Sequence, residues 1–271
     1  MERIRSAIDK AREARGESAP ARRARPELPA ALTENWQTLA QADVNPRLLH
    51  RNRILAIEGG PDSGPFDMLR TKVLQQMRAN NWRRLAITSP TSGCGKTTTS
   101  TNLAFSFARQ PELRVVVVEA DMRRPALAKT LGQKGISHQF SRVLAGQAPW
   151  AKHMLRIGPN LAFATNAAPV NHSAELLQSA TARRALEEVE QALDPSVMIF
   201  DTPPLLVSDD TLGFLDQVDC VLLVAEAEAT TIDEIDNCEQ ELAARSNVLG
   251  VVLNKCRYMG KGYGYDYDYG Y

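Results

Sequence analysis

The most restrictive feature of the sequence is the stretch from Leu85 to Thr99, which reads LAITSPTSGCGKTTT. A short apolar run ends in a loop that contains Gly93 and Gly95, and a helix is expected to follow from Thr98 to Arg109. A strand, a glycine-containing loop and a helix form a phosphate-binding loop, because backbone amides at a helix N-terminus converge on phosphates. The stretch therefore predicts an α/β domain that binds a nucleotide.

Two side chains of this loop carry most of the expected chemistry. Lys96 would bring a positive charge to the β- and γ-phosphates, and the hydroxyl of Thr97 would bind Mg²⁺. Pro90 replaces the first glycine of the usual motif, so the strand and helix on either side are needed to recognise the loop. The loop residues predicted to bind the nucleotide are Ser92, Gly93, Cys94, Gly95, Lys96, Thr97 and Thr98.

Two other apolar runs end in acidic side chains. A valine-rich run leads to Glu119 and Asp121, and a second apolar run leads to Asp201. One acidic residue after a strand is often a helix cap or a turn former. Several of them favour a ligand site, because ligands lie at the carboxyl ends of strands in an open parallel sheet. We therefore expect these carboxylates to meet Lys96 in one crevice.

The pattern of apolar runs predicts the fold class. A short edge strand is expected at residues 53–57. The main strands are expected near residues 84–89, 113–119, 160–165, 197–201, 219–225 and 248–254. Further helices are expected at residues 65–78, 180–193 and 231–245. This alternation is typical of an α/β protein with a doubly wound, mainly parallel sheet.

Composition divides the chain into three parts. Residues 1–50 are rich in Ala, Arg, Glu and Pro and are predicted to be a mobile N-terminal extension, and residues 51–257 hold the α/β domain. Residues 258–271 form a tail with too little aliphatic bulk to fold alone, so the sequence predicts a disordered segment that presents phenol groups. This tail holds all six tyrosines of the chain: Tyr258, Tyr263, Tyr265, Tyr267, Tyr269 and Tyr271.

Charge and cysteine content narrow the function classes. The 32 basic and 32 acidic residues balance, which gives no indication of a nucleic-acid partner. The four cysteines lack metal-ligand spacing, which favours reduced thiols, although Cys94 in the phosphate loop could be sensitive to oxidation. No apolar run reaches the length of a membrane span, so we expect a cytoplasmic protein.

Together these motifs resemble those of the bacterial tyrosine kinases (BY-kinases) of capsule and exopolysaccharide systems, a P-loop family unrelated to eukaryotic protein kinases. The resemblance covers roughly residues 65–271. It rests on the loop at 88–97, the acidic-x-Asp-x-Arg-Arg-Pro motif at 119–125, the Asp-Thr-Pro-Pro motif at 201–204 and the tyrosine tail. The related Min and Par ATPases carry a signature lysine where this chain has Thr91, which argues against placing the chain in that class.

The resemblance implies an enzyme that uses ATP and Mg²⁺. The γ-phosphoryl group would pass to the tyrosines of the tail, mainly through positioning and charge stabilisation. The implied catalytic residues are Lys96, Glu119, Asp121 and Asp201. The implied Mg²⁺ ligands, direct or through water, are Thr97, Asp121 and Asp201.

Three roles stay open at this point. Glu119 or Asp121 would accept or orient the phenolic proton, since a tyrosine with a pKa of about 10 is a poor nucleophile at neutral pH. Arg123 and Arg124 would each either stabilise developing charge at the nucleotide or cap the end of their strand. Asn254 would either face the nucleotide base or form a turn.

The chain departs from the family pattern at three places, and the first is the phosphate loop, which has Ser92 and Cys94 where Pro and Glu are common. Glu119 stands where the family usually has Asp, which changes the reach of the carboxylate by one methylene. The family often carries a Glu-x-x-Arg-x-x-Arg helix that mediates ring assembly, and the corresponding residues here are Gly64, Asp67 and Arg70. Only the last basic residue is kept, which puts ring formation in doubt.

The resemblance also implies partners. A membrane-bound regulator of polysaccharide chain length would activate the kinase through its cytoplasmic tail, which would hold the protein at the inner face of the membrane. A tyrosine phosphatase would reverse the reaction. The unmodified tail would dock in the crevice of a neighbouring subunit, and accumulated phosphate would eject it by charge repulsion.

Two other functions fit the same residues. A P-loop ATPase could use hydrolysis as a conformational timer, with the tyrosine tail as a partner-binding element. A scaffold could bind the nucleotide without catalysis. The presence of Lys96, Thr97, Asp121 and Asp201 weighs against the scaffold.

Overall fold

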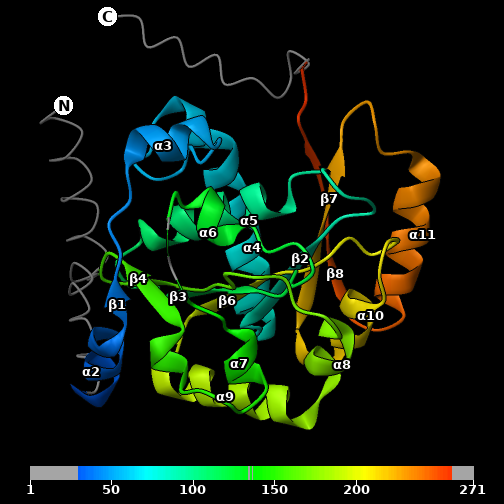
Figure 1. Ribbon diagram of the computed structural model, residues 1–271. Coiled ribbons are helices and arrows are strands. Elements are labelled where there is room, and N and C mark those ends of the chain that lie inside the picture. Colours follow the sequence, from blue (N-terminus) through cyan, green and yellow to red (C-terminus); the bar gives the residue numbers. More distant parts are fainter. Residues whose placement is uncertain (1–29, 134, 136, 258–271) are drawn as a thin grey trace, which may run out of the picture.

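The computed structural model describes residues 30–257, apart from residues 134 and 136. The predicted phosphoacceptor tyrosines lie outside the described residues. The described part contains one sheet of eight strands in the order β1-β4-β5-β3-β6-β2-β7-β8 (Figure 1). All neighbouring strands are parallel except β4 and β5. The strands are β1 (Ala40–Gln41), β2 (Arg84–Thr88), β3 (Val115–Glu119), β4 (Met154–Ile157), β5 (Leu161–Ala164), β6 (Val197–Asp201), β7 (Cys220–Glu226) and β8 (Asn247–Asn254).

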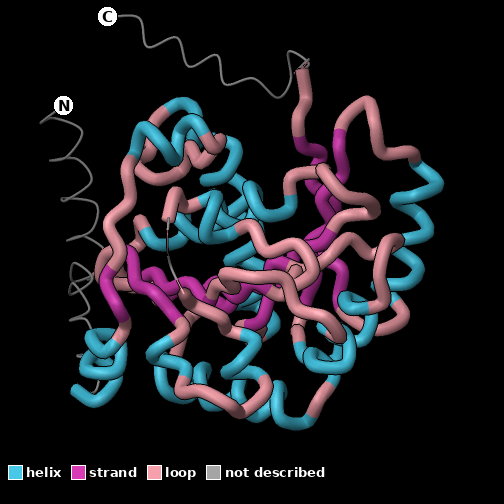
Figure 2. The backbone as a smooth tube through the Cα atoms, viewed as in Figure 1, coloured by secondary structure: helices cyan, strands magenta, loops and turns pink. Residues whose placement is uncertain are grey.

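Helices cover both faces of this sheet, as Figure 2 shows. α4 and α5 pack on the face that carries Val115 and Val117, whereas α7 and α9 pack on the face that carries Val116 and Val118. Alternate residues of β3 are thus buried on opposite faces, as a strand inside a doubly wound sheet requires. The predicted fold class is confirmed. The helices are α2 (Ala30–Thr38), α3 (Pro46–Arg51), α4 (Gly64–Asn80), α5 (Lys96–Ala108), α6 (Leu127–Thr130), α7 (Ser141–Leu144), α8 (Ser173–Gln178), α9 (Ala180–Leu193), α10 (Asp210–Phe214) and α11 (Ile232–Ala243).

The segment before residue 51 is more ordered than its composition predicts. From Ala30 onward it forms α2, β1 and α3, and β1 pairs in parallel with β4. Trp36 is 4% exposed, and its Nε1 donates to the carbonyl oxygen of Leu193 at 2.9 Å. The expectation of a mobile extension up to residue 50 therefore fails from Ala30 onward. Its apolar anchors are isolated between polar residues and give no periodic signal.

Two strand predictions near the edge of the sheet also need correction. Residues 53–57 form a loop, because the amides of Leu55 and Ala56 donate to Asn102 Oδ1 of α5 at 2.7 and 3.0 Å. β4 was not predicted, and it pairs with β5 as an antiparallel hairpin. The predicted parallel order is thus interrupted once, at the side of the sheet away from β8.

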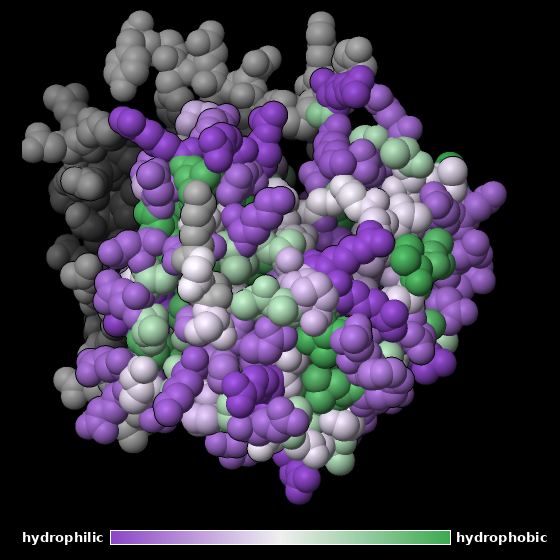
Figure 3. All heavy atoms as spheres, viewed as in Figure 1, coloured by the Kyte–Doolittle hydropathy of each residue, from purple (hydrophilic) through white to green (hydrophobic). Residues whose placement is uncertain are grey.

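The surface seen in Figure 3 is mostly hydrophilic, with small separate hydrophobic patches. The large apolar side chains that are most exposed include Ile232 at the start of α11 and Val207 after β6. Among the helices of the described residues, none combines the length and the apolar character that crossing a membrane requires.

Candidate active site

The predicted phosphate loop lies between the end of β2 and the start of α5 at Lys96. Gly93 and Gly95 have φ angles of +93° and +97°, a region that favours glycine. A Cβ atom on Gly95 would lie 2.2 Å from Asn254 Nδ2, so this position has no room for a side chain. Asn254, at the end of β8, donates through Nδ2 to the carbonyl oxygen of Cys94 at 2.8 Å. The last strand thus holds the backbone of the loop.

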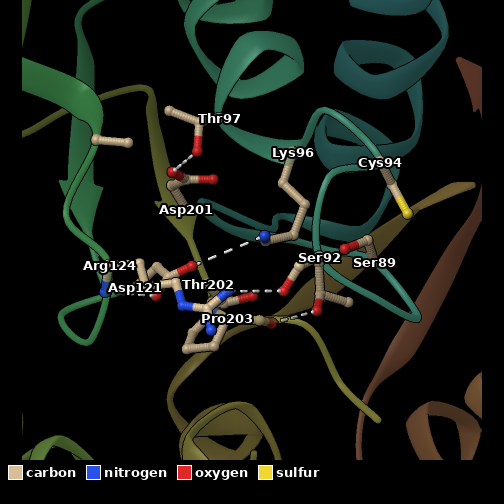
Figure 4. Close-up of polar contacts among 12 residues, drawn as sticks. Ser89, Ser92, Cys94, Lys96, Thr97, Asp121, Arg124, Asp201, Thr202 and Pro203 are labelled. Carbon is tan, nitrogen blue, oxygen red and sulfur yellow. Dashed lines mark hydrogen bonds and ion pairs between the residues drawn. The ribbon is translucent and has the colours of Figure 1, made fainter. Parts of the chain in front are cut away.

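The carboxylate of Asp201 accepts hydrogen bonds from two hydroxyl groups in the first turns of α5, and Figure 4 shows the one from Thr97. Thr97 Oγ1 donates to Asp201 Oδ2 at 2.6 Å, and Ser100 Oγ donates to Oδ1 at 3.3 Å. Asp201 is 1% exposed, and burial raises its pKa to about 6. A carboxylate and a hydroxyl beside a phosphate loop are oxygen ligands of the kind that Mg²⁺ binds. These residues therefore fit the ion that the sequence implies.

Lys96 and Asp121 form an ion pair beside the loop, with Nζ 3.7 Å from Oδ2 (Figure 4). Both side chains are almost fully buried. Burial raises the pKa of Asp121, and the charge of Lys96 opposes that rise. Across the described residues, no group of three or more His, Cys, Asp or Glu side chains is placed to hold a metal ion. A bound Mg²⁺ would therefore take its remaining ligands from phosphate oxygens and water.

The two arginines after β3 point to different partners. Arg123 Nε donates to Asp210 Oδ2 at 2.6 Å, and Ser173 Oγ donates to the other oxygen of this buried carboxylate at 2.5 Å. Arg124 instead reaches the phosphate loop, where Nη1 donates to Ser92 Oγ at 3.4 Å (Figure 4). The sequence left the roles of both arginines open and placed Arg123 among the nucleotide-binding residues, but the guanidinium that the structure brings to the loop is that of Arg124.

The thiol of Cys94 lies inside the loop and is 1% exposed. Burial would raise its pKa, but hydrogen bonds with Thr91 and Thr230 lower it. The shortest of these contacts joins Sγ to the carbonyl oxygen of Thr91 at 3.3 Å. The expected sensitivity of Cys94 to oxidation is thus opposed by its lack of access to solvent.

Comparison with known proteins agrees with this geometry. Residues 85–261 match the CobQ/CobB/MinD/ParA nucleotide binding domain. The tyrosine-protein kinase YwqD of Bacillus subtilis is 30% identical over 203 residues, which cover 71% of this chain and 81% of that protein. The chain belongs to the bacterial tyrosine kinase family. The putative tyrosine-protein kinase EpsB of Ralstonia solanacearum is 32% identical over 222 residues, which cover 79% of this chain but 29% of EpsB.

The structural comparison finds the same family. The kinase domain of the Escherichia coli tyrosine kinase ETK superposes with a TM-score of 0.67 at 27% sequence identity. The matched region covers 78% of this chain and 84% of that domain. The described fold is therefore similar to that of a solved bacterial tyrosine kinase domain.

Glu119, which stands where the family usually has Asp, holds several backbone amides of the fold. Glu119 Oε1 accepts from the amides of Ala126 and Leu127 at 2.6 and 2.7 Å, and Oε2 accepts from the amide of Asn166 at 2.6 Å. The side chain is fully buried, and burial raises its pKa to about 7 although these amides oppose the rise. Three backbone amides hold this buried carboxylate, which favours a structural role for Glu119 over that of a catalytic base.

The residues at the ring-assembly positions are engaged within the subunit. Arg70 Nη1 donates to Asp67 Oδ1 at 3.3 Å and to the carbonyl oxygen of Ser106 in α5 at 3.1 Å. Asp67 also accepts from Ser63 Oγ and pairs with Arg109. These contacts join α4 to the α5 region and engage Arg70, the one residue that the chain keeps from the ring-assembly pattern.

Proposed function

We propose that this chain is an ATP-dependent protein-tyrosine kinase that phosphorylates the tyrosines of its own C-terminal tail. The observation that carries the proposal is the convergence of Lys96, Thr97, Asp121 and Asp201 at the ends of three neighbouring strands. Membership of the bacterial tyrosine kinase family adds to it, and the tyrosine cluster supplies acceptors. The relatives named as tyrosine kinases support this reading over a hydrolytic timer.

The proposed nucleotide site uses the loop and the acidic strand ends. The amides of residues 93–98 and the charge of Lys96 would hold the phosphates at the N-terminus of α5. Thr97 and Asp201, together with Asp121, would hold Mg²⁺, which when bound would neutralise charge on the phosphates. Asn254 would act through the loop backbone that it already contacts.

In the proposed reaction, the phenolic oxygen of a tail tyrosine forms a bond to the γ-phosphorus. The bond between that phosphorus and the oxygen bridging to the β-phosphate breaks, and ADP leaves. We assign the phenolic proton to the carboxylate of Asp121, because this side chain keeps some exposure, whereas Glu119 is fully buried and accepts from three backbone amides. Burial raises the pKa of Asp121, which favours proton acceptance, and the charge of Lys96 at 3.7 Å opposes that rise.

The proposed physiological role is control of capsule or exopolysaccharide synthesis at the inner face of the membrane. We assign activation to a membrane-bound chain-length regulator and reversal to a tyrosine phosphatase. Phosphates of about −1.5 to −2 charges each would make the tail strongly anionic and drive it out of a neighbouring subunit.

One experiment tests the kinase assignment. The full chain is incubated with MgATP, with and without the cytoplasmic tail of the candidate regulator, and intact mass and phosphotyrosine are measured. Phosphate additions on the peptide from 258 to 271 are expected, and a Lys96→Met control should abolish them. Nucleotide turnover without phosphotyrosine, even with the regulator tail present, would instead establish the ATPase timer.

A further inference from the structure

The two arginines after β3 have equal charge and nearly equal position in the chain but opposite surroundings. Arg123 is held by the buried carboxylate of Asp210 and lies 3.8 Å from Asp209. Arg124 has no carboxylate within 4.0 Å among the residues that the structure describes, and its contact with Ser92 ties it to the phosphate loop. The charge of Arg124 is therefore available to a ligand of the loop.

The space around Arg124 suits a phosphate. Arg124, Ser92 and Gly93 are all exposed, and a Cβ atom built on Gly93 would meet nothing within 4 Å. The backbone amide of Arg124 donates to Asp121 Oδ1 at 3.3 Å, which holds the base of this side chain beside the proposed proton acceptor. Figure 4 shows Lys96 at the start of α5 and Arg124 in the segment after β3, both beside Asp121 and the phosphate loop.

The charge of the site favours a further cationic side chain besides Lys96 and the proposed Mg²⁺. Position 91 holds a threonine, and Lys96 is the cation that the loop itself contributes. Its ammonium group lies beside Asp121, while Asp201 adds another carboxylate at the same edge of the sheet. Charge on the transferring phosphoryl group in the transition state must be met by fixed positive groups. An arginine suits that task because its planar guanidinium stays charged and can donate two parallel hydrogen bonds to phosphate oxygens.

We propose that Arg124 is a catalytic residue that binds the γ-phosphoryl group from within the same subunit. The proposal rests on the proposed kinase function and adds a residue to its site. Arg124 would leave Ser92 and donate to γ-phosphate oxygens as the tyrosine attacks. Arg123 keeps its contact with Asp210 and takes no part in this step.

The test compares Arg124→Ala, Arg124→Lys and Arg123→Ala in the full chain. Two quantities are measured for each: the total rate of γ-phosphoryl transfer to tyrosine and to water, and the Kd for MgADP. We expect Arg124→Ala to lower the total rate by about a hundredfold while the Kd for MgADP changes by less than about threefold. Arg124→Lys should restore part of the rate, because it supplies charge without the fork of donors.

Arg123→Ala is the matched control. This variant should lower the melting temperature, because it leaves the buried Asp210 without its cation. It should not lower the transfer rate while leaving the Kd for MgADP unchanged. The inference is overturned if Arg124→Ala keeps a total rate within about threefold of the unmodified chain, or if Arg123→Ala separates the two quantities equally.

A wrong kinase assignment would give a different result from a wrong role for Arg124. The unmodified chain would then release phosphate to water without forming phosphotyrosine, and the total rates of the variants would still decide the role of Arg124. If the unmodified chain shows no turnover, the ratio of the Kd values for MgADP and for MgATPγS decides it. Arg124→Ala must reduce the preference for the nucleotide that carries a γ-group, and an unchanged ratio overturns the inference.

Discussion

The carboxyl ends of β3 and β6 are neighbours in the sheet, with Glu119 and Asp201 in register, but their carboxylates have different kinds of partner. Glu119 accepts from three backbone amides, whereas Asp201 accepts from the hydroxyls of Thr97 and Ser100. A backbone amide turns away only when its loop moves, but a hydroxyl rotates about a single bond. Burial is common to both ends, so the exchangeable partners are what distinguish a ligand-binding carboxylate from a structural one.

Removing the charge of Asp201 at the end of β6 should have the largest effect on activity. Asp201→Asn should lower phosphoryl transfer by about a thousandfold, or ~4 kcal/mol, because the proposed Mg²⁺ site loses its anionic ligand. The measurement is the transfer rate at saturating ATP over a range of Mg²⁺ concentrations. A variant that keeps the rate of the unmodified chain would show that Asp201 is not a ligand.

The same variant should unfold at a higher temperature at pH 7 in the absence of nucleotide. Burial raises the pKa of Asp201 to about 6, so folding disfavours its ionised form. The stabilising contribution of the protonated carboxyl is complete below the unfolded pKa, about 4, and is lost as the pH rises through about 6. Calorimetry should therefore show that the gain from Asp201→Asn shrinks as the pH falls toward 4.

At the β3 end the expected effect is on folding. Glu119→Ala should lower the free energy of unfolding by about 2–4 kcal/mol, because it leaves the amides of Ala126, Leu127 and Asn166 without an acceptor. Chemical denaturation measures this loss. Glu119→Gln keeps one acceptor oxygen, so its free energy of unfolding should lie between those of Glu119→Ala and the unmodified chain. Its transfer rate should stay within about tenfold of the unmodified chain. Loss of transfer in a stable Glu119→Gln variant would restore Glu119 as the base.

Smaller effects on nucleotide affinity are expected from removing either hydroxyl group that donates to Asp201. Thr97→Ala should weaken Mg²⁺-dependent nucleotide binding by about tenfold, which is ~1.4 kcal/mol. Ser100→Ala should change the affinity by less than about twofold, because Ser100 is fully buried and also donates to the carbonyl oxygen of Lys96. Isothermal titration with MgADP compares the two. Equal losses would mean that both hydroxyls act only by orienting Asp201.

Local motifs predict the parts of this molecule that are built from adjacent residues. The strand, loop and helix around Lys96 follow from one continuous stretch, and the valine-rich run fixes β3. The orientation of Arg123 depends on Asp210, and the order of the segment around Trp36 depends on Leu193. Both partners are remote in the sequence and carry no periodic signal. Such contacts could not be predicted from neighbouring residues.

The hydrogen bond from Asn254 to the carbonyl oxygen of Cys94 has a consequence for biosynthesis. The two residues are 160 positions apart, and Asn254 ends the last strand of the sheet. A ribosome therefore releases the whole phosphate loop long before the amide group that fixes it has been made. The growing chain reaches its final loop geometry only when β8 emerges and docks on β7. The final geometry of the phosphate loop is consequently available only after β8 has been made, and the tyrosines follow β8 in the sequence.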